Sequence, residues 1–434
     1  MINCIEPSPF KEGVAYLAAT SYKFGDYTPY LYKTTNYGES WTLITNGIKN
    51  NHYTRAIRSD KVREGLLYAG TEWGMYISFD DGKQWSSFQL NLPMTSIRDL
   101  AVRDNDLIAA THGRSFWMID DLTPLHQLTE EMAKSDFYLY KPDITYRTQQ
   151  SSGWSKPDMR LEGENHPNGV IVNYYIKDKK ETDTIALEIL DAKGALVQKY
   201  NTNAKVDKQD PSATKPLKVV TGGNRFIWDL RYPGFKSFEG MVLYSSPNVG
   251  PKAVPGTYRV RLTYNGIASE KEFTIVKDPR LPNTETDFKN QFDFLIKVRD
   301  QVNRANQAII DIRSVKKDLA YVKEKVTTDE DLNKLVEEFE TKLDKVENNI
   351  HMTKNQSRQD PLNYGIRINN RLAFLMSDSQ RGDYPPTDQS LAFFKEIKKE
   401  LDTEIDSLND LFEAYVNKIN SQVSDKQIKM ISTN

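Results

Sequence analysis

Two acidic side chains near the N-terminus are the candidate catalytic residues. Asp26 and Glu72 each follow a β-rich run that ends in Thr, Tyr16–Thr20 in one case and Leu67–Thr71 in the other. We therefore expect them on neighbouring loops of adjacent sheets. Glycoside hydrolysis requires two carboxylates about 5–10 Å apart. Asp26 and Glu72 are the one pair in this region that suggests this chemistry.

The same loops carry aromatic side chains among a few polar ones. Rings stack on the apolar faces of sugars and peptides, and polar groups then fix the orientation of the ligand. This composition favours recognition of a glycan or a peptide, and packing at the rim of the strands is the alternative. The candidate ligand-binding residues are Tyr22, Phe24, Tyr27, Trp73, His112 and Arg114. His112 is also considered as a general base, but no partner for it is identifiable, so packing is the alternative.

Other chemistry has no sequence signal. One Cys and five scattered His give no metal-ligand spacing, and phosphate loops, dinucleotide loops and nucleophile elbows are missing, so we expect no metal and no cofactor. A formal net charge of −2 argues against a nucleic-acid partner. No window approaches the roughly 18 consecutive apolar residues of a membrane span.

An internal repeat indicates which elements position these loops. Thr34–Trp41 recurs as Ser78–Trp85 at an offset of 44 residues, inside the period of about 40–50 residues of a four-stranded propeller blade. The run Leu107–Thr111 marks a third blade, although its turn at Asp120–Leu122 has lost the Gly and the Trp. The sequence therefore predicts about three blades of an incomplete β-propeller over residues 1–122.

Both copies of the repeat follow the pattern Ser/Thr-x-Asn/Asp-x-Gly-x-x-Trp. The Asn or Asp can accept hydrogen bonds from backbone N–H groups of its own turn, the Gly supplies a positive φ, and the Trp is expected to be buried under the turn. We therefore predict a structural role rather than a catalytic one. The residues concerned are Thr34, Asn36, Gly38 and Trp41 in one copy and Ser78, Asp80, Gly82 and Trp85 in the other.

These turns resemble the Asp-box repeats of sialidases, xyloglucanase-type glycosidases and sortilin-type propellers. The runs Gly70–Ser78 and Ala110–Trp117 are most similar to the sortilin-like BNR-repeat "glycosyl hydrolase" proteins secreted by Bacteroidetes. The resemblance implies a secreted or periplasmic protein, although no signal peptide is recognisable in this chain. It also implies an active face opposite the Asp boxes. A sialidase would need an arginine cluster and a Tyr/Glu pair there, and only Arg114 can be placed.

Two or three blades cannot close a ring, and their open edges would promote aggregation. We therefore expect the chain to be the C-terminal portion of a longer protein, with a partner chain supplying the other blades as the alternative. Cys4 is expected to be a lone buried thiol rather than a lipid anchor, because the apolar stretch that such a signal needs is missing.

The rest of the chain divides into a linker, a strand-rich part and a helical part. Residues 123–167 are expected to be a linker, which includes the Ser- and Gly-bearing stretch Ser151–Pro157. Over residues 168–278, several short alternating runs and the hairpin signal Asn265-Gly266 predict a β-sandwich. The runs Phe226–Asp229 and Pro255–Tyr258 resemble Ig-like modules, and Trp228 is expected in the core.

From residue 281 to 434 the apolar period changes to about 3.6, which predicts an antiparallel helical bundle. Helix starts are predicted at Thr284 with Asp287, at Thr328 with Asp331, and at Asp360-Pro361. The Asp360-Pro361 start is expected to open one helix that runs through Leu375. The charged backs of these helices are read as a solvated surface, and a partner-binding or dimerising coiled coil is the alternative.

The patterns together predict a multidomain protein that is mainly β and then α: a partial propeller, an Ig-like sandwich and a helical bundle. The expected function is extracellular or periplasmic recognition, in which the Asp-box propeller binds a glycan or a peptide. The alternative is a glycoside hydrolase of the Asp-box superfamily with most catalytic residues in blades outside this chain. Peptide capture inside the ring, which the sortilin resemblance implies, is a third possibility.

Overall fold

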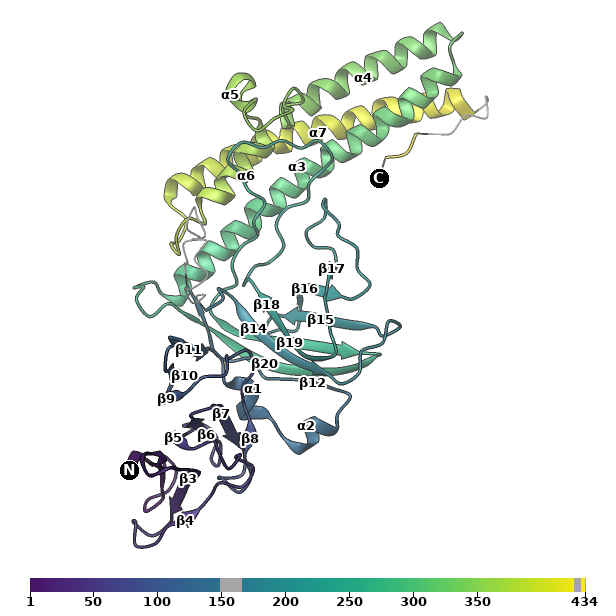
Figure 1. Cartoon of the computed structure of the whole chain (residues 1–434). Coiled ribbons are helices and arrows are strands. Elements are labelled where there is room, and N and C mark those ends of the chain that lie inside the picture. The colour runs from purple at the N-terminus through teal and green to yellow at the C-terminus, as the bar shows by residue number, and fades with distance from the viewer. Residues whose placement is uncertain (149–165, 425–430, 434) are drawn as a thin grey trace. The chain divides into compact units, whose positions relative to one another are not determined.

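The computed structural model describes residues 1–148, 166–424 and 431–433 of the chain (Figure 1). Contacts divide the protein into two units, Met1–Ser135 and Asp136–Asn434. The predicted order, antiparallel sheets followed by helices, is confirmed. The finer division into four domains stays a prediction, and the stretch Ser151–Pro157 of the predicted linker lies outside the described residues.

The first unit consists of three antiparallel sheets in which consecutive strands are neighbours. The first sheet contains β1 (Ile2–Pro7), β2 (Ala15–Ser21), β3 (Asp26–Thr34) and β4 (Thr42–Leu43). The second contains β5 (Thr54–Ser59), β6 (Leu67–Thr71), β7 (Gly74–Ser78) and β8 (Ser86–Ser87). The third contains β9 (Ile97–Arg103), β10 (Asp106–Thr111) and β11 (Phe116–Ile119). This meander order is that of the predicted blades.

The second sheet is buried on both faces, which explains why β6 and β7 have no polar alternation. On one face, Ile57, Tyr76 and Trp85 share a core with Leu31 of the first sheet. On the other face, a second core joins this sheet to β9 and β10 of the third. A Cβ at Gly70 would lie 2.8 Å from Ile97, so the absence of a side chain there allows the third sheet to approach closely.

Each repeated turn is closed by its own side chains. Asp80 Oδ1 accepts hydrogen bonds from Ser78 Oγ at 2.8 Å and from the backbone N–H of Gln84 at 2.9 Å, and Gly82 has a φ of 83°. Thr34 and Asn36 make the same pattern in the first copy. These contacts lie within the turn, as a structural role requires.

The two tryptophans of the repeat differ in burial. Trp85 is 1% exposed, and its indole N–H donates to the Ile44 carbonyl of the first sheet at 2.7 Å. Trp41 is 38% exposed, so the expectation that it is buried is wrong. Trp85 is covered by the sheet that precedes its own. Trp41 belongs to the first sheet, which has no such neighbour among the described residues.

A buried carboxylate joins the second sheet to the helices that end this unit, α1 (Thr123–Gln127) and α2 (Glu130–Lys134). Asp60 is fully buried and accepts hydrogen bonds from Tyr68 Oη at 3.0 Å and from the backbone N–H groups of Val62 and Arg63 at 2.8 Å. His126 Nε2 of α1 lies 3.0 Å from Asp60 Oδ2, the oxygen that Tyr68 also contacts. Burial acts to raise the pKa of Asp60, but these hydrogen bonds outweigh it and lower that pKa.

The second unit begins with two sheets that share one core. Its smaller sheet has the order β12 (Phe137–Leu139), β14 (Val170–Ile176) and β18 (Gly222–Trp228). The larger has the order β13 (Thr145–Arg147), β20 (Ile267–Lys277), β19 (Gly256–Tyr264), β15 (Ile185–Leu190), β16 (Leu196–Asn201) and β17 (Lys215–Pro216). Thus β12 and β13, inside the predicted linker, belong to these sheets. Trp228 is buried in their common core, as expected.

Among the described residues, five helices follow: α3 (Glu285–Lys325), α4 (Glu330–Ile350), α5 (Pro361–Tyr364), α6 (Ile368–Asp378) and α7 (Asp388–Ser424). Thr284 and Asp287 form a capping box at α3, as predicted. The predicted start of α4 at Thr328 is wrong by one residue, because Asp329 accepts the bond from Leu332 N–H. The single helix predicted from Asp360 is also wrong, because Gly365, at a φ of 74°, separates α5 from α6.

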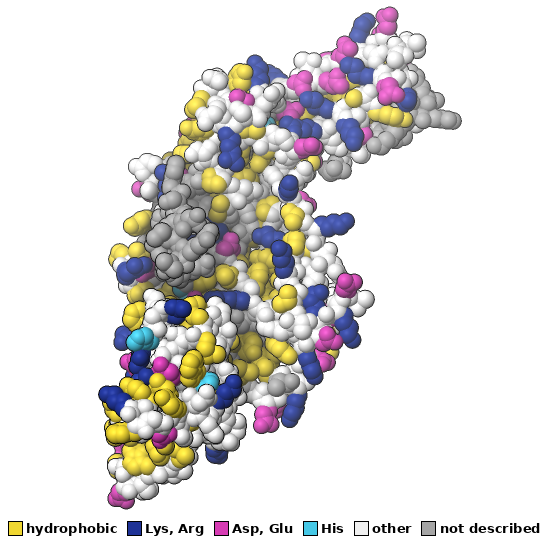
Figure 2. Space-filling view, in the orientation of Figure 1, with side chains coloured by type: hydrophobic (Ala, Val, Ile, Leu, Met, Phe, Trp, Pro, Cys, Tyr) yellow, Lys and Arg dark blue, Asp and Glu magenta, His cyan; other side chains and the backbone are white. Residues whose placement is uncertain are grey.

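Within the described residues, no helix has both the length and the apolar character that crossing a bilayer requires. On the surface that Figure 2 shows, the helices of the second unit carry charges of both signs, from lysines and arginines and from carboxylates.

Replacing Asp60 by alanine should destabilise the first unit by about 2–4 kcal/mol, because Tyr68 and two backbone N–H groups lose a buried acceptor. The lowered pKa of Asp60 means that its contribution is complete above its unfolded value of about 3.9 and is lost as the pH falls through the lower folded value. Hydrogen exchange of the β5 and β6 amides, followed in urea and across pH 2–7, measures both effects. The exposed Glu39→Ala should leave this exchange unchanged, and equal effects of the two variants would contradict the assignment.

Candidate functional site

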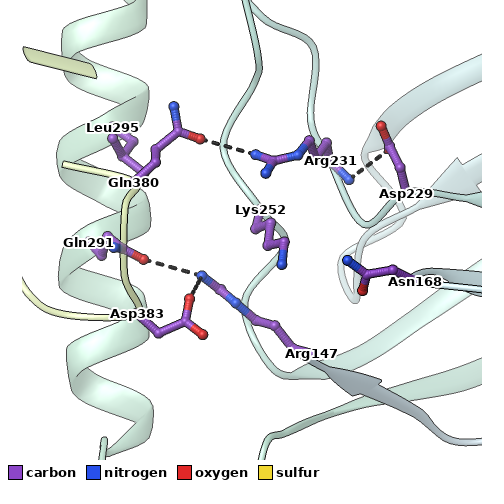
Figure 3. A pocket seen from close by; sticks show the side chains of 9 residues that line it. All are labelled: Arg147, Asn168, Asp229, Arg231, Lys252, Gln291, Leu295, Gln380 and Asp383. Atoms are coloured by element: carbon purple, nitrogen blue, oxygen red, sulfur yellow. Dashed lines mark hydrogen bonds and ion pairs between the residues drawn. The ribbon is translucent and has the colours of Figure 1, made fainter. Parts of the chain in front are cut away.

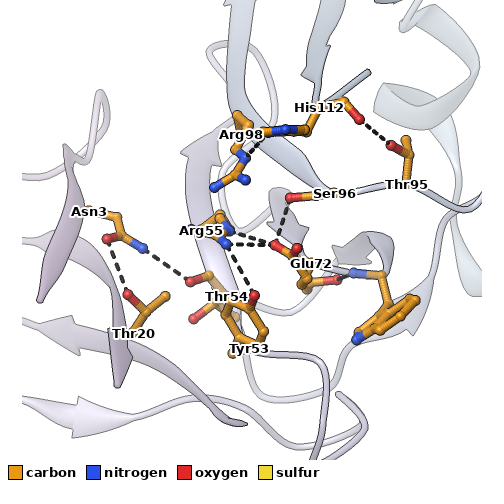
Figure 4. Close-up of polar contacts among 12 residues, drawn as sticks. Asn3, Thr20, Tyr53, Thr54, Arg55, Glu72, Thr95, Ser96, Arg98 and His112 are labelled. Atoms are coloured by element: carbon orange, nitrogen blue, oxygen red, sulfur yellow. Dashed lines mark hydrogen bonds and ion pairs between the residues drawn. The ribbon is translucent and has the colours of Figure 1, made fainter. Parts of the chain in front are cut away.

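Arg55 of β5 is the centre of a polar cluster in the first unit (Figure 4). Its Nε donates to Glu72 Oε2 at 2.8 Å, and its Nη2 lies 2.7 Å from the same oxygen. Ser96 Oγ also donates to this oxygen at 2.7 Å, and Nη2 donates to Tyr53 Oη at 3.1 Å. The guanidinium is therefore held on its edge by an ion pair and a phenol.

The cluster has a well-defined electrostatic state. The Arg55 side chain is 8% exposed and that of Glu72 is 24% exposed. Partial burial acts to raise the pKa of Glu72, but the hydrogen bonds from Ser96 and Arg55 and the charge of Arg55 outweigh it, so that pKa is lowered. Glu72 is thus ionised at neutral pH, and its charge is matched by Arg55.

Aromatic rings lie against this ion pair. The guanidinium carbon of Arg55 is 4.9 Å from the ring centres of both Tyr22 and Tyr53, the distance of a cation–π contact. Tyr22 and Tyr53 are stacked at 5.2 Å, and Tyr27 lies 5.9 Å from Tyr53. Two of the predicted ligand residues, Tyr22 and Tyr27, are therefore brought together with Glu72 around a residue that the sequence reasoning did not select.

Several of the candidate rings are open to solvent. Phe24 is 88% exposed, Tyr27 is 53% exposed and Trp73 is 47% exposed. Figure 2 shows that apolar side chains gather on the surface in the N-terminal part of the chain. Exposed aromatics that stand on a rigid support provide the flat apolar surface that sugar and peptide ligands use.

Strands β1, β5 and β9 border a cavity of about 730 Å³ beside the cluster. Arg58 extends from β5 into its lining and pairs with Asp99 at 2.6 Å and with Glu6 at 3.7 Å. Burial raises the pKa of Glu6, against the opposing charge of Arg58. Cys4 also lines the cavity and is half-buried rather than buried, because it faces this space and contacts Arg58.

The other candidates have separate partners. Asp26 lies at the start of β3, where its carboxylate accepts hydrogen bonds from Tyr30 Oη at 2.6 Å and from Thr28 N–H at 2.9 Å. These bonds lower the pKa of Asp26. Its contacts are therefore distinct from those of Glu72, and no shared partner joins the two carboxylates in the described part of the chain.

The two candidates from the third sheet lie at the turn between β10 and β11. His112 Nδ1 accepts a hydrogen bond from Arg98 Nε at 2.9 Å, and the His112 carbonyl accepts one from Thr95. Arg114 is exposed and bonds to the backbone of Gly113. The partner that sequence reasoning did not find for His112 is thus an arginine, which cannot accept a proton from it.

The residues missed from the sequence are Arg55, Ser96 and Arg98. An arginine in a strand of otherwise buried residues, Thr54–Ile57, is a signal that identifies Arg55, because a buried guanidinium requires a partner. Ser96 and Arg98 carry no such signal. Among the residues that the structure describes, no group of three or more His, Cys, Asp or Glu side chains is arranged to hold a metal ion.

No protein-family model and no curated protein matches this chain, so the resemblance to Asp-box proteins stays a prediction. Similar solved structures include an ancestral GH74 enzyme, at 24% identity over 26% of this chain and 14% of that one, with a TM-score of 0.22. YCF48 bound to D1 peptide is similar at 16% identity over 41% and 48%, with a TM-score of 0.21. The extracellular domain of a putative one-component system from B. thetaiotaomicron is similar at 11% identity over 64% and 31%, with a TM-score of 0.22.

The chain thus spans less than half of each of these proteins. At TM-scores near 0.2, the similarities identify no function for it.

A double-mutant cycle of Arg55→Met and Glu72→Gln should give a coupling energy of about 1–3 kcal/mol, because removing either partner leaves the other charge or its hydrogen bonds unmatched. The readout is the urea midpoint of exchange for amides of β5 and β7. Because the pKa of Glu72 is lowered, the coupling should be present above about pH 4.3 and decline as the pH falls further.

The control is the exposed pair of Lys11 and Glu64, whose side chains are 65% and 56% exposed. Lys11→Met should cause no measurable change. A coupling near zero for Arg55 and Glu72 would show that their ion pair does not stabilise the cluster around Arg55.

Proposed function

We propose that the first unit is a recognition module that binds a neutral glycan on the aromatic face around Arg55. The observation that carries the proposal is the stack of Tyr22 and Tyr53 on the paired Arg55, with Tyr27 beside it. Rings fixed in this way lose little conformational entropy when a sugar stacks on them, since their positions are already set.

The charges of the cluster favour a neutral ligand. Arg55 and Glu72 satisfy each other at 2.7–2.8 Å, and Asp26 is occupied by Tyr30 and Thr28. An ionic ligand would have to replace one of these partners, whereas an uncharged sugar needs only ring faces and hydroxyl contacts. A peptide is the alternative ligand, and its binding would have to use the same rings through apolar side chains.

Binding is better supported than hydrolysis. A glycosidase needs one carboxylic acid with a raised pKa to protonate the leaving group. Both Asp26 and Glu72 have lowered pKa values, so neither is suited to that role at neutral pH. Glu72 is moreover held by three donors on one oxygen.

The wider context also belongs to the proposal. The Asp-box resemblance supports a secreted or periplasmic protein whose three sheets are blades of a larger propeller. The two sheets of the second unit are then an Ig-like sandwich, and the helices that follow attach or space the recognition face.

The proposal is tested by titrating the full chain with cello-, xylo- and xyloglucan oligosaccharides and measuring the heat of binding by calorimetry. We expect at least one of them to bind, and Tyr27→Ala and Trp73→Ala to weaken that binding about tenfold each, the effect of losing one stacked ring at roughly 1–1.5 kcal/mol. Reducing ends should not appear during the titration, because the pKa values of Asp26 and Glu72 are both lowered and neither is suited to act as the general acid.

Tyr321→Ala serves as the matched control, because this tyrosine is 41% exposed on α3 in the second unit and should leave binding unchanged. If peptides from an array bind and the oligosaccharides do not, the ligand is a peptide and the glycan proposal is wrong. Release of reducing sugars would establish hydrolysis instead.

A further inference from the structure

The second unit contains a polar cavity of about 220 Å³ that the proposed function does not use (Figure 3). One wall is formed by Arg147 of β13, by Asp229 and Arg231 directly after β18, and by Lys252 before β19. The opposite wall is formed by Gln291 of α3 and by Asp383 after α6. The volume is far above the roughly 10–15 Å³ that one water needs.

The charges around this cavity are not balanced. Arg147, Arg231 and Lys252 provide three cations, and Asp229 and Asp383 provide two carboxylates. Arg147 and Asp383 form a buried ion pair at 2.8 Å, in which both side chains are 3% exposed. One positive charge therefore remains, and the two cations outside this pair, Arg231 and Lys252, are half-buried, which favours an anion as the occupant of the cavity.

Three residues that line the cavity each carry a buried polar atom without a hydrogen-bond partner in the described part of the chain: Arg147 Nε, Asp383 Oδ2 and Asn168 Oδ1. Arg147 uses its other nitrogens, since Nη1 donates to the Ala253 carbonyl at 2.9 Å and Nη2 to Gln291 and Asp383. Each buried polar atom without a partner is costly, so three on residues around one cavity favour a polar occupant.

The unmatched atoms define the chemistry of that occupant. The Arg147 Nε–H is a donor, and the Lys252 ammonium, which has three N–H groups, donates to the Thr148 carbonyl at 2.8 Å. Both favour the oxygens of an anion. Asp383 Oδ2 and Asn168 Oδ1 are acceptors, so the occupant must also donate hydrogen bonds. Sulfate has no hydrogen to give to them, and phosphate near neutral pH carries only one or two hydroxyl groups.

We propose that this cavity binds a small hydroxylated carboxylate, such as a sugar acid. Its carboxylate lies against Lys252 and the Arg147 Nε–H, and its hydroxyl groups donate to Asp383 and Asn168. Gln380, which accepts a hydrogen bond from Arg231 at 3.1 Å, holds that cation at the rim. This site is independent of the aromatic face in the first unit, and neither proposal depends on the other.

The protonation of Lys252 links binding to pH. Burial is the largest influence on this amine and lowers its pKa to about 8, with Arg231 and Arg147 lowering it further and Asp383 and Asp229 opposing them. A bound carboxylate favours the charged amine, so binding should take up protons and weaken as the pH rises above about 8.

Calorimetry of the full chain with sodium glucuronate, glucose and inorganic phosphate tests the inference. Glucuronate should bind, and glucose and phosphate should bind at least tenfold more weakly, because the first lacks the charge and the second is poor in donors. Glucuronate binding should weaken by up to about tenfold between pH 7 and 9. Buffers of different ionisation enthalpy should report proton uptake near pH 8.

Lys252→Gln should reduce glucuronate affinity at least tenfold and remove its pH dependence, since it deletes one charge-assisted hydrogen bond. Asn168→Asp, which keeps the size of the side chain and adds a negative charge, should have a similar effect on affinity. Lys218→Gln, an exposed lysine of the same unit, is the control and should change nothing. Absence of glucuronate binding, equal binding of glucose or phosphate, or full affinity in Lys252→Gln would overturn the proposal.

Discussion

The ion pair between Arg55 and Glu72 is the contact on which the face of the first unit depends. A charge pair that is largely removed from water is stable only if its remaining hydrogen-bonding groups are satisfied. Ser96 and Tyr53 fulfil that condition. Because the partners come from β5, from the turn between β6 and β7 and from the residue before β9, the second and third sheets must be correctly placed for the pair to form. The stack of Tyr22 extends the same constraint to the first sheet.

The relative position of the three sheets is determined by other contacts, namely the packing between the sheets and the hydrogen bonds of the turns. The second sheet presents apolar side chains to both neighbours, so its position is determined on two faces at once. The turn at Asp80 adds a polar link, because the next residue, Asp81, accepts a hydrogen bond from Tyr16 Oη of the first sheet at 2.6 Å. An apolar core alone tolerates sliding between sheets, whereas hydrogen bonds between named atoms do not. The ring positions around Arg55 therefore depend on these distant contacts.

Local rules account for what the sequence could predict. Asn265-Gly266 forms the expected hairpin turn, with φ angles of 47° and 88°, because both residues tolerate a left-handed backbone. The repeat predicted the turns at Asn36 and Asp80 for the same kind of reason, since their bonds lie within four residues. The prediction of a single helix from Asp360 is wrong for local reasons as well. The Asp360 side chain accepts hydrogen bonds from the backbone N–H groups of Gln356 and Ser357, which precede it, and Gly365 interrupts the helix.

The candidate sites depend on contacts that no local rule describes. Glu72, Tyr22 and Tyr27 could be selected as candidates because their residue types suit a binding face. The strand around Arg55 signals that this arginine needs a partner, but its partners are known only when chain segments from three sheets meet. Asp383 and Arg147, 236 residues apart, are a more extreme case. Their spacing carries no periodic signal, so only the folded chain reveals that the pair borders a cavity.

The two proposed sites differ in how their charges are matched. Beside the aromatic face, Arg55 and Arg58 each have a carboxylate at 2.6–2.8 Å, so an uncharged sugar can approach without separating a pair. In the second unit, the Arg147–Asp383 pair leaves Arg147 Nε and Asp383 Oδ2 unused, and Lys252 adds a charge that no carboxylate matches at ion-pair distance among the described residues. A matched pair has no unbalanced charge for a ligand to neutralise, while an unmatched, half-buried cation is stabilised by an anion. The balance of charge is therefore the reason that we propose a neutral ligand for the aromatic face and an anion for the cavity of the second unit.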